Sequence, residues 1–73
     1  MNATHQWDAG DAGCGTLVIE LYRRVKQLQP GERLEVTAHS PGASVDIPAW
    51  CRMSGHRLLS ADPPFYLIER KHD

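Results

Sequence analysis

The stretch Asp11-Ala12-Gly13-Cys14-Gly15-Thr16, followed directly by Leu17-Val18-Ile19-Glu20-Leu21-Tyr22, decides how this chain folds. A short polar loop that contains one cysteine leads straight into a strongly apolar segment. Apolar side chains then recur at helical spacing, as Leu17, Leu21, Val25 and Leu28, with Val18 and Tyr22 widening the stripe. We therefore expect a first helix from about Thr16 to Leu28, ended by Pro30-Gly31.

Cys14 is expected at, or just before, the beginning of this helix. Unpaired backbone N–H groups and the positive end of the helix dipole point to that position, and both favour a thiolate over a thiol. Arg23, Arg24 and Lys26 place positive charge in the far half of the helix, where the dipole is negative. The sequence thus identifies Cys14 as the candidate catalytic residue. The alternative is an inert surface cysteine.

One more helix and four strands are expected in the rest of the chain. The second helix begins between Ser44 and Pro48, where proline fits a first turn, and Gly55 caps its end. The four strands are expected at Thr4–Ala9, Glu32–His39, His56–Ala61 and Phe65–Arg70. This order of strand, helix, strand, helix, strand, strand predicts a two-layer α/β (α+β) sandwich. Two helices would pack on one face of a four-stranded mixed sheet and leave the other face partly solvated.

A single hydrophobic core should join these two layers. The residues expected to be buried in it are Leu17 or Val18, Leu21, Val25, Leu34, Val36, Ile47, Trp50, Leu58 and Leu67. At the other extreme, Lys71-His72-Asp73 is expected to be a frayed tail.

Length and composition favour one small domain, residues 1–73, of which 41% is apolar. No run is long and apolar enough to span a membrane, and the first residues lack the features of a signal peptide, so we expect a cytoplasmic monomer without membrane contact. A formal net charge of −1 argues against strong direct nucleic-acid binding, although it leaves a local basic patch open.

Several other residue types have both a functional and a structural interpretation. Cys51 lies in an apolar mid-helix pattern and is expected to be a buried, inert thiol, although a Cys14–Cys51 disulfide stays open because sequence gives no geometry. The two cysteines and four histidines show no metal-ligand spacing, so no metal site is expected. Trp7 and Trp50 are expected in the core rather than as binding anchors. The basic half of the first helix is either a solvated face or a dock for an acidic partner or a tRNA-bearing complex.

Two stretches carry a resemblance to a known family: Pro30-Gly31-Glu32-Arg33-Leu34-Glu35-Val36, and Asp46-Ile47-Pro48-Ala49-Trp50-Cys51-Arg52-Met53-Ser54-Gly55-His56-Arg57-Leu58-Leu59. They resemble the TusA/SirA family of small sulfur-carrier proteins, and the resemblance covers nearly the whole chain. The family signature, Gly-Leu-x-Cys-Pro-x-Pro at the entry to the first helix, is matched only at Cys14. Gly15 and Leu17 stand where the family has its two prolines.

The resemblance implies a fold like that of the C-terminal domain of translation initiation factor three. It also implies that Cys14 accepts sulfane sulfur as a persulfide from a donor, such as a cysteine desulfurase. The sulfur then passes to an acceptor protein, in tRNA thiolation or a related transfer, and no cofactor is needed. The missing prolines favour a second hypothesis, a non-catalytic interaction or regulatory module that kept the fold and lost the chemistry.

Overall fold

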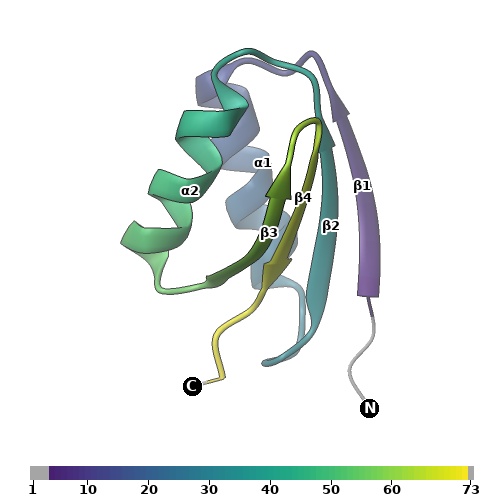
Figure 1. Cartoon of the computed structure of the whole chain (residues 1–73). Coiled ribbons are helices and arrows are strands. Elements are labelled where there is room, and N and C mark those ends of the chain that lie inside the picture. The colour runs from purple at the N-terminus through teal and green to yellow at the C-terminus, as the bar shows by residue number, and fades with distance from the viewer. Residues whose placement is uncertain (1–3, 73) are drawn as a thin grey trace.

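The protein is a two-layer sandwich in which two helices cover one face of a four-stranded sheet (Figure 1). The computed structural model describes residues 4–72 and, at Cys14, the backbone. The elements in chain order are β1 (Thr4–Gly10), α1 (Cys14–Lys26), β2 (Arg33–Ala38), α2 (Ala43–Ser54), β3 (Arg57–Asp62) and β4 (Phe65–Glu69). The strands are ordered β1-β2-β4-β3, with β1 parallel to β2 and both other pairs antiparallel. The predicted fold class is therefore confirmed, including the mixed sheet.

The core lies between the helices and the inner face of the sheet, where α1 contributes the predicted stripe. Leu17, Leu21 and Val25 are fully buried and Leu28 is 6% exposed. Val18 packs at the margin of the core, but the prediction for Tyr22 is wrong, because its side chain is 54% exposed. The predicted core members of β2 and α2 are all confirmed as buried: Leu34, Val36, Ile47 and Trp50.

In β4 the prediction named the wrong apolar residue as buried. Tyr66 and Ile68 point into the core, whereas Leu67 lies on the outer face and is only partly buried. The cause is the pairing with β2, which sets Tyr66 opposite Val36 and Ile68 opposite Leu34. Leu58 in β3, also expected in the core, is likewise only partly buried and packs against its edge.

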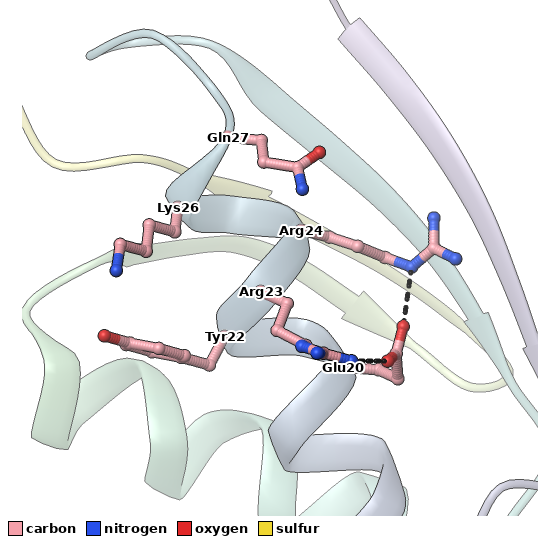
Figure 2. Close-up of a pocket in the computed structure, with 6 residues that line it drawn as sticks. All are labelled: Glu20, Tyr22, Arg23, Arg24, Lys26 and Gln27. Carbon is pink, nitrogen blue, oxygen red and sulfur yellow. Dashed lines mark hydrogen bonds and ion pairs between the residues drawn. The ribbon is translucent and has the colours of Figure 1, made fainter.

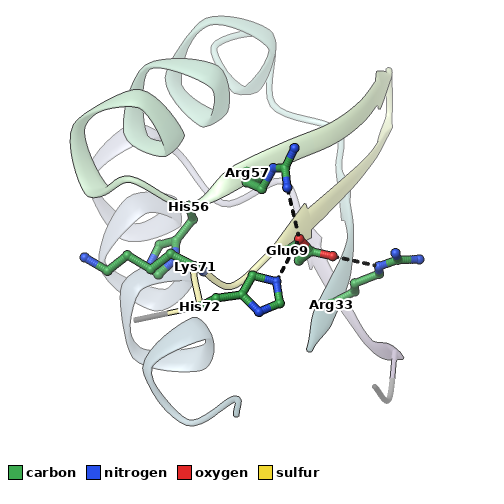
Figure 3. Close-up of polar contacts among 6 residues, drawn as sticks. All are labelled: Arg33, His56, Arg57, Glu69, Lys71 and His72. Atoms are coloured by element: carbon green, nitrogen blue, oxygen red, sulfur yellow. Dashed lines mark hydrogen bonds and ion pairs between the residues drawn. The ribbon is translucent and has the colours of Figure 1, made fainter. Parts of the chain in front are cut away.

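The outer face of the sheet is partly solvated, as predicted, and its one buried acid is surrounded by cations. Arg33 and Glu35 of β2 are exposed there, but Glu69 of β4 is 7% exposed. The Glu69 carboxylate lies 3.3 Å from Arg33 Nε, 3.9 Å from Arg57 Nη1 and 3.5 Å from His72 Nε2 (Figure 3). These contacts bring two arginines and one histidine to a single acid at the end of the sheet.

The two helices begin earlier than the sequence predicted. α1 begins at Cys14 rather than Thr16, because Gly15 lacks the proline ring that would push Cys14 out of helical geometry. The helix ends at Lys26, two residues before the predicted end at Leu28. α2 begins at Ala43, before the predicted range, so Pro48 lies inside it rather than in its first turn. The first turn closes when Gly42 O accepts the N–H groups of residues 45 and 46. Gly55 caps α2 with a φ of 85°, as expected.

Candidate functional site

The N-terminal end of α1 places Cys14 as the first helical residue, preceded by Gly13 at the cap. Gly13 has no side chain to accept the first N–H groups of the helix, and residues 14–17 include no carboxylate. The first intrahelical bond joins Leu17 N–H to Gly13 O at 2.7 Å. The N–H groups of residues 14–16 therefore lie ahead of that bond, at the positive end of the dipole. Cys14 was predicted at, or just before, the start of the first helix, and its backbone position as the first residue of α1 confirms this. Exposure of its side chain lies outside what the structure describes.

The surface next to this helix start is open. Apart from the adjacent residues and the nearby backbone of α1 itself, a Cβ built on Gly13 or Gly15 would meet no described heavy atom within 4 Å, and both glycines are exposed together with Thr16. Asp8, the acid that precedes the loop, accepts the N–H of Gly10 at 2.9 Å and so helps to hold the turn that leads into α1. The site therefore offers space on both sides of Cys14 and backbone donors at its base.

Cys51 has the opposite environment. Its side chain is 3% exposed and carries a free thiol, so the disulfide that sequence left open does not form through Cys51. Burial in the core raises the pKa of the Cys51 thiol from 9.0 to about 11. The prediction of a buried cysteine is confirmed, and its raised pKa keeps it protonated at neutral pH.

The basic half of α1 forms a hollow of about 550 Å³ on the helix surface (Figure 2). Its lining residues are Glu20, Tyr22, Arg23, Arg24, Lys26 and Gln27. Arg23 and Arg24 both approach the carboxylate of Glu20, at 3.2 and 3.5 Å. Arg24 also lies 4.6 Å above the ring of Trp7, which is partly buried at the edge of the core. The side chains of Arg23 and Arg24 are therefore held by intramolecular partners rather than pointing freely into solvent.

Among the side chains that the structure describes, which do not include that of Cys14, no group of three from His, Cys, Asp or Glu comes together to form a metal centre. His56, which follows α2, has its ring 5.3 Å from that of Trp50. Its Nδ1 accepts the backbone N–H of Lys71 at 3.1 Å. His56 thus joins the end of α2 to the segment after β4.

That segment is more ordered than the sequence suggested, and its role was missed. Lys71 is bonded to His56, and His72 pairs with Glu69, so the predicted fraying is wrong for these two residues; Asp73 lies outside the described part. Arg70 reaches back to α1 and donates through Nη1 to Lys26 O at 3.1 Å and also to Leu28 O. A run of charged residues at a chain end carries no periodic signal from which such contacts could be predicted.

Neither helix of residues 4–72 is long and apolar enough to cross a membrane. Comparison with known proteins identifies both a family and a curated relative. The sequence model of the family described as "Sulfurtransferase TusA" matches residues 5–69. A protein of Bacillus subtilis (strain 168) described as "Putative sulfur carrier protein YrkF" is 34% identical over 62 residues, which are 85% of this chain. The chain spans 34% of the length of that relative. Given the family match over nearly all of α1, α2 and the sheet, this chain belongs to the TusA family of sulfurtransferases and sulfur carriers.

Proposed function

We propose that Cys14 carries sulfane sulfur as a persulfide, taken from a donor protein such as a cysteine desulfurase. The sulfur is then delivered to an acceptor protein, in tRNA thiolation or a related transfer. The observation that supports this most directly is the position of Cys14 as the first residue of α1, between two glycines with open space around them. Family membership supports a sulfur-carrier role in general.

The chemistry needs only thiols and persulfides. The Cys14 thiolate attacks the terminal sulfur of the donor's Cys–S–SH group, so that a new S–S bond forms at Cys14. The S–S bond of the donor breaks, and its cysteine leaves with the electron pair as a thiolate. In the second transfer an acceptor thiolate attacks the terminal sulfur on Cys14 in the same way, and Cys14 leaves as the thiolate. No oxidant or reductant is consumed, because each step exchanges one thiolate and one persulfide.

The start of α1 supplies what this exchange requires. A thiolate at a helix N-terminus is stabilised by the unpaired N–H groups and by the dipole, so we expect the pKa of the Cys14 thiol to lie below that of an unperturbed cysteine. The absence of any carboxylate in residues 14–17 leaves that stabilisation unopposed within the first turn. Two partner proteins must bring their own sulfur atoms to Cys14 in turn, and the small neighbours Gly13 and Gly15 permit that approach.

The test is intact mass after incubation of the protein with a cysteine desulfurase and free cysteine. We expect one added sulfur that is lost on reduction, is absent from Cys14→Ser and is retained in Cys51→Ala. Cys51→Ala is the matched control because it removes the other thiol and creates little space. Sulfur added equally to the wild type and to Cys14→Ser would rule out Cys14 as the carrier.

A second candidate, a non-catalytic interaction module of the same family, is favoured by one specific observation. Gly15 replaces the first signature proline, and α1 consequently extends to include Cys14. A folded protein that accepts no sulfur from either a desulfurase or a small-molecule persulfide would establish this candidate instead.

A further inference from the structure

The two edge strands of the sheet differ in how well they are protected against pairing with a further strand. β1 and β3 are the outer members of the order β1-β2-β4-β3, so within residues 4–72 one side of each has no strand next to it (Figure 1). The register of β3 with β4 shifts part of the way along, the strand begins at Arg57 and ends at Asp62, and Pro63 and Pro64 follow it. Bulges, charges and prolines are means by which an edge strand avoids a new partner, so β3 is protected.

β1 lacks this protection over its first five residues, 4–8. These residues pair with β2 in one regular parallel register, and they include one formal charge, that of Asp8. The register shifts only after Asp8, where local bonds take over: the Gly10 N–H donates to the Asp8 carboxylate, and the Ala12 N–H donates to the Ala9 carbonyl. The open part of the edge is therefore residues 4–8, which is long enough to pair with a short extended segment.

A cavity of about 240 Å³ lies between β1 and the end of α1. Its lining residues are His5, Gln6, Arg24, Gln27, Leu28 and Leu34. His5 is the register partner of Leu34 on the inner face of the sheet, whereas the Gln6 side chain bonds to Glu35 on the outer face. Gln6 therefore borders the cavity through its backbone, which places the cavity against the main chain of the open edge.

The ionisable side chains of this lining already have acidic partners. His5 Nε2 lies 3.5 Å from the carboxylate of Glu32, and Arg24 Nε lies 3.5 Å from that of Glu20. Arg24 extends from α1 toward the sheet, with its guanidinium 4.6 Å from the centre of the Trp7 ring (Figure 2). Because these charges are paired within the chain, the cavity does not select for a charged ligand.

The deeper part of the lining is apolar. Leu28 and Leu34 are 6% and 3% exposed, so an apolar side chain that entered the cavity would leave water for contact with the edge of the core. A strand added to β1 would direct every second side chain to the inner face of the sheet, where the cavity lies. One apolar side chain of such a strand can therefore enter the cavity while its backbone bonds to β1.

A second copy of this chain is a poorer occupant of the same edge. Antiparallel pairing of β1 with β1 of another copy, around a two-fold axis, would place both helical layers on one side of the joined sheet. The two α1 helices would then be neighbours across the junction, and α1 carries three cations, Arg23, Arg24 and Lys26, against a single acid, Glu20. Like charges oppose that arrangement, whereas a lone uncharged segment brings no such repulsion.

We propose that the open edge of β1 binds an extended segment of a partner protein, which adds a fifth strand to the sheet along residues 4–8. The segment is uncharged where it faces α1 and places one apolar side chain in the cavity beside Arg24 and Gln27. Backbone hydrogen bonds supply the affinity, and the cavity supplies the specificity. Arg24 is about 15 Å along the axis of α1 from Cys14, so this site does not rest on the persulfide chemistry.

The first experiment is an NMR titration of the reduced, sulfur-free protein with a capped peptide, acetyl-Ser-Thr-Leu-Thr-Leu-Thr-Ser-amide. We expect amide shifts in β1 and at the end of α1, together with slower hydrogen exchange of the β1 amides that face the open edge. β3 is the internal control, because it is the other edge strand and is protected. Equal shifts in β1 and β3, or no binding at millimolar peptide, would overturn the proposal.

Two N-methylated forms of the peptide separate strand addition from simple apolar contact. Alternate N–H groups of an extended peptide face opposite edges, so methylation of the leucines blocks one edge and methylation of the threonines blocks the other. We expect one form to bind within about twofold of the parent peptide and the other to bind at least about tenfold more weakly, because its bonds to β1 are lost. Equal affinities of the two forms would show that no strand is added.

A matched pair of protein variants tests the cavity. Gln27→Trp places a large side chain in the lining and should weaken peptide binding by about tenfold. Gln29→Trp adds the same side chain at an exposed position outside the lining, and should change binding by less than about twofold. Equal effects of the two variants would overturn the assignment of the cavity. Sedimentation that shows a dimer dissociated by the peptide would instead assign the edge to a second copy and overturn the proposed partner.

Discussion

Cys51 shows how its surroundings determine what a cysteine can do. Its neighbours in the core leave it 3% exposed, and the resulting loss of hydration raises the pKa of its thiol to about 11. At pH 8 such a thiol is ionised in only about one molecule in a thousand. The sequence predicted this burial because Ile47 lies four residues before Cys51, one helical turn away, and Trp50 lies directly beside it in the same apolar pattern. Cys51 is therefore unsuited to the sulfur transfer that we propose for Cys14.

The raised pKa of the Cys51 thiol predicts a dependence of stability on pH. Its pKa is 9.0 when unfolded and about 11 when folded, so above pH 9 the unfolded chain loses this proton first. The free energy of unfolding should therefore fall as pH rises from about 9 to about 11.

Burial raises the pKa of Tyr66 as well, so the decline has more than one source. Denaturant unfolding of wild type and Cys51→Ala isolates the contribution of the cysteine, and the variant should show a shallower decline. Identical slopes in the two proteins would contradict the assigned pKa.

For some residues the sequence could not predict which side chains are buried, because both faces of the strand carry apolar residues. In β4 both alternating sets contain apolar residues, with Phe65 and Leu67 on one face and Tyr66 and Ile68 on the other. Only the register with β2 decides which set faces the helices, and register depends on the whole sheet. Leu34 and Val36 were predicted correctly because charged residues alternate with them in the same strand.

At the scale of elements, the sequence predicted each helix and strand of the described residues, and the errors are at their ends. α1 extends to Cys14 and α2 begins at Ala43, because local turn geometry rather than apolar spacing sets those boundaries. This affects the candidate site directly. The backbone position of Cys14 within a first turn is a property of the helix end, which is the part that sequence specifies least.

The helix assignment leads to a paired prediction for α1. Leu21 is fully buried, so Leu21→Ala should lower the free energy of unfolding by about 2–5 kcal/mol, through lost burial and the cavity left behind. Ile19 lies on the same helix but is 62% exposed, so Ile19→Ala should cost less than about 1 kcal/mol. Chemical denaturation of both variants checks the pair. Similar costs for the two would be incompatible with the orientation of α1.

At the scale of the whole molecule, the residues that follow β4 connect the sheet to the C-terminal ends of both helices. Arg70 joins the end of β4 to the end of α1, and its backbone bonds to Gly31 and Glu32 at the turn before β2. Lys71 joins the same segment to His56 after α2. The side-chain contacts of Arg70 join residues 42 and 44 positions apart in the chain. A reading of local patterns could not find them.

We therefore expect Arg70→Ala to destabilise the whole domain. Loss of charge-assisted bonds to the carbonyls of Lys26 and Leu28 should cost about 1–2 kcal/mol, which in a domain of this size lowers Tm by about 5–10 °C. His72→Ala removes only an exposed partner of Glu69 and should cost less than about 1 kcal/mol. Thermal unfolding distinguishes the two. A Tm for Arg70→Ala equal to that of His72→Ala would show that Arg70 does not hold the layers together.

The arrangement in Figure 1 also limits how the domain can be tethered to another protein. β1 begins and β4 ends at one end of the molecule, whereas α1 starts at the other, and the longest dimension is 32 Å. A domain fused beyond either of these strands would need about ten fully extended linker residues to reach Cys14. With a shorter linker, sulfur could pass only between separate molecules. With a short linker, the yield of sulfur transfer from a fused donor domain would then depend on protein concentration. With a long linker, transfer within one molecule would give the same yield at any dilution.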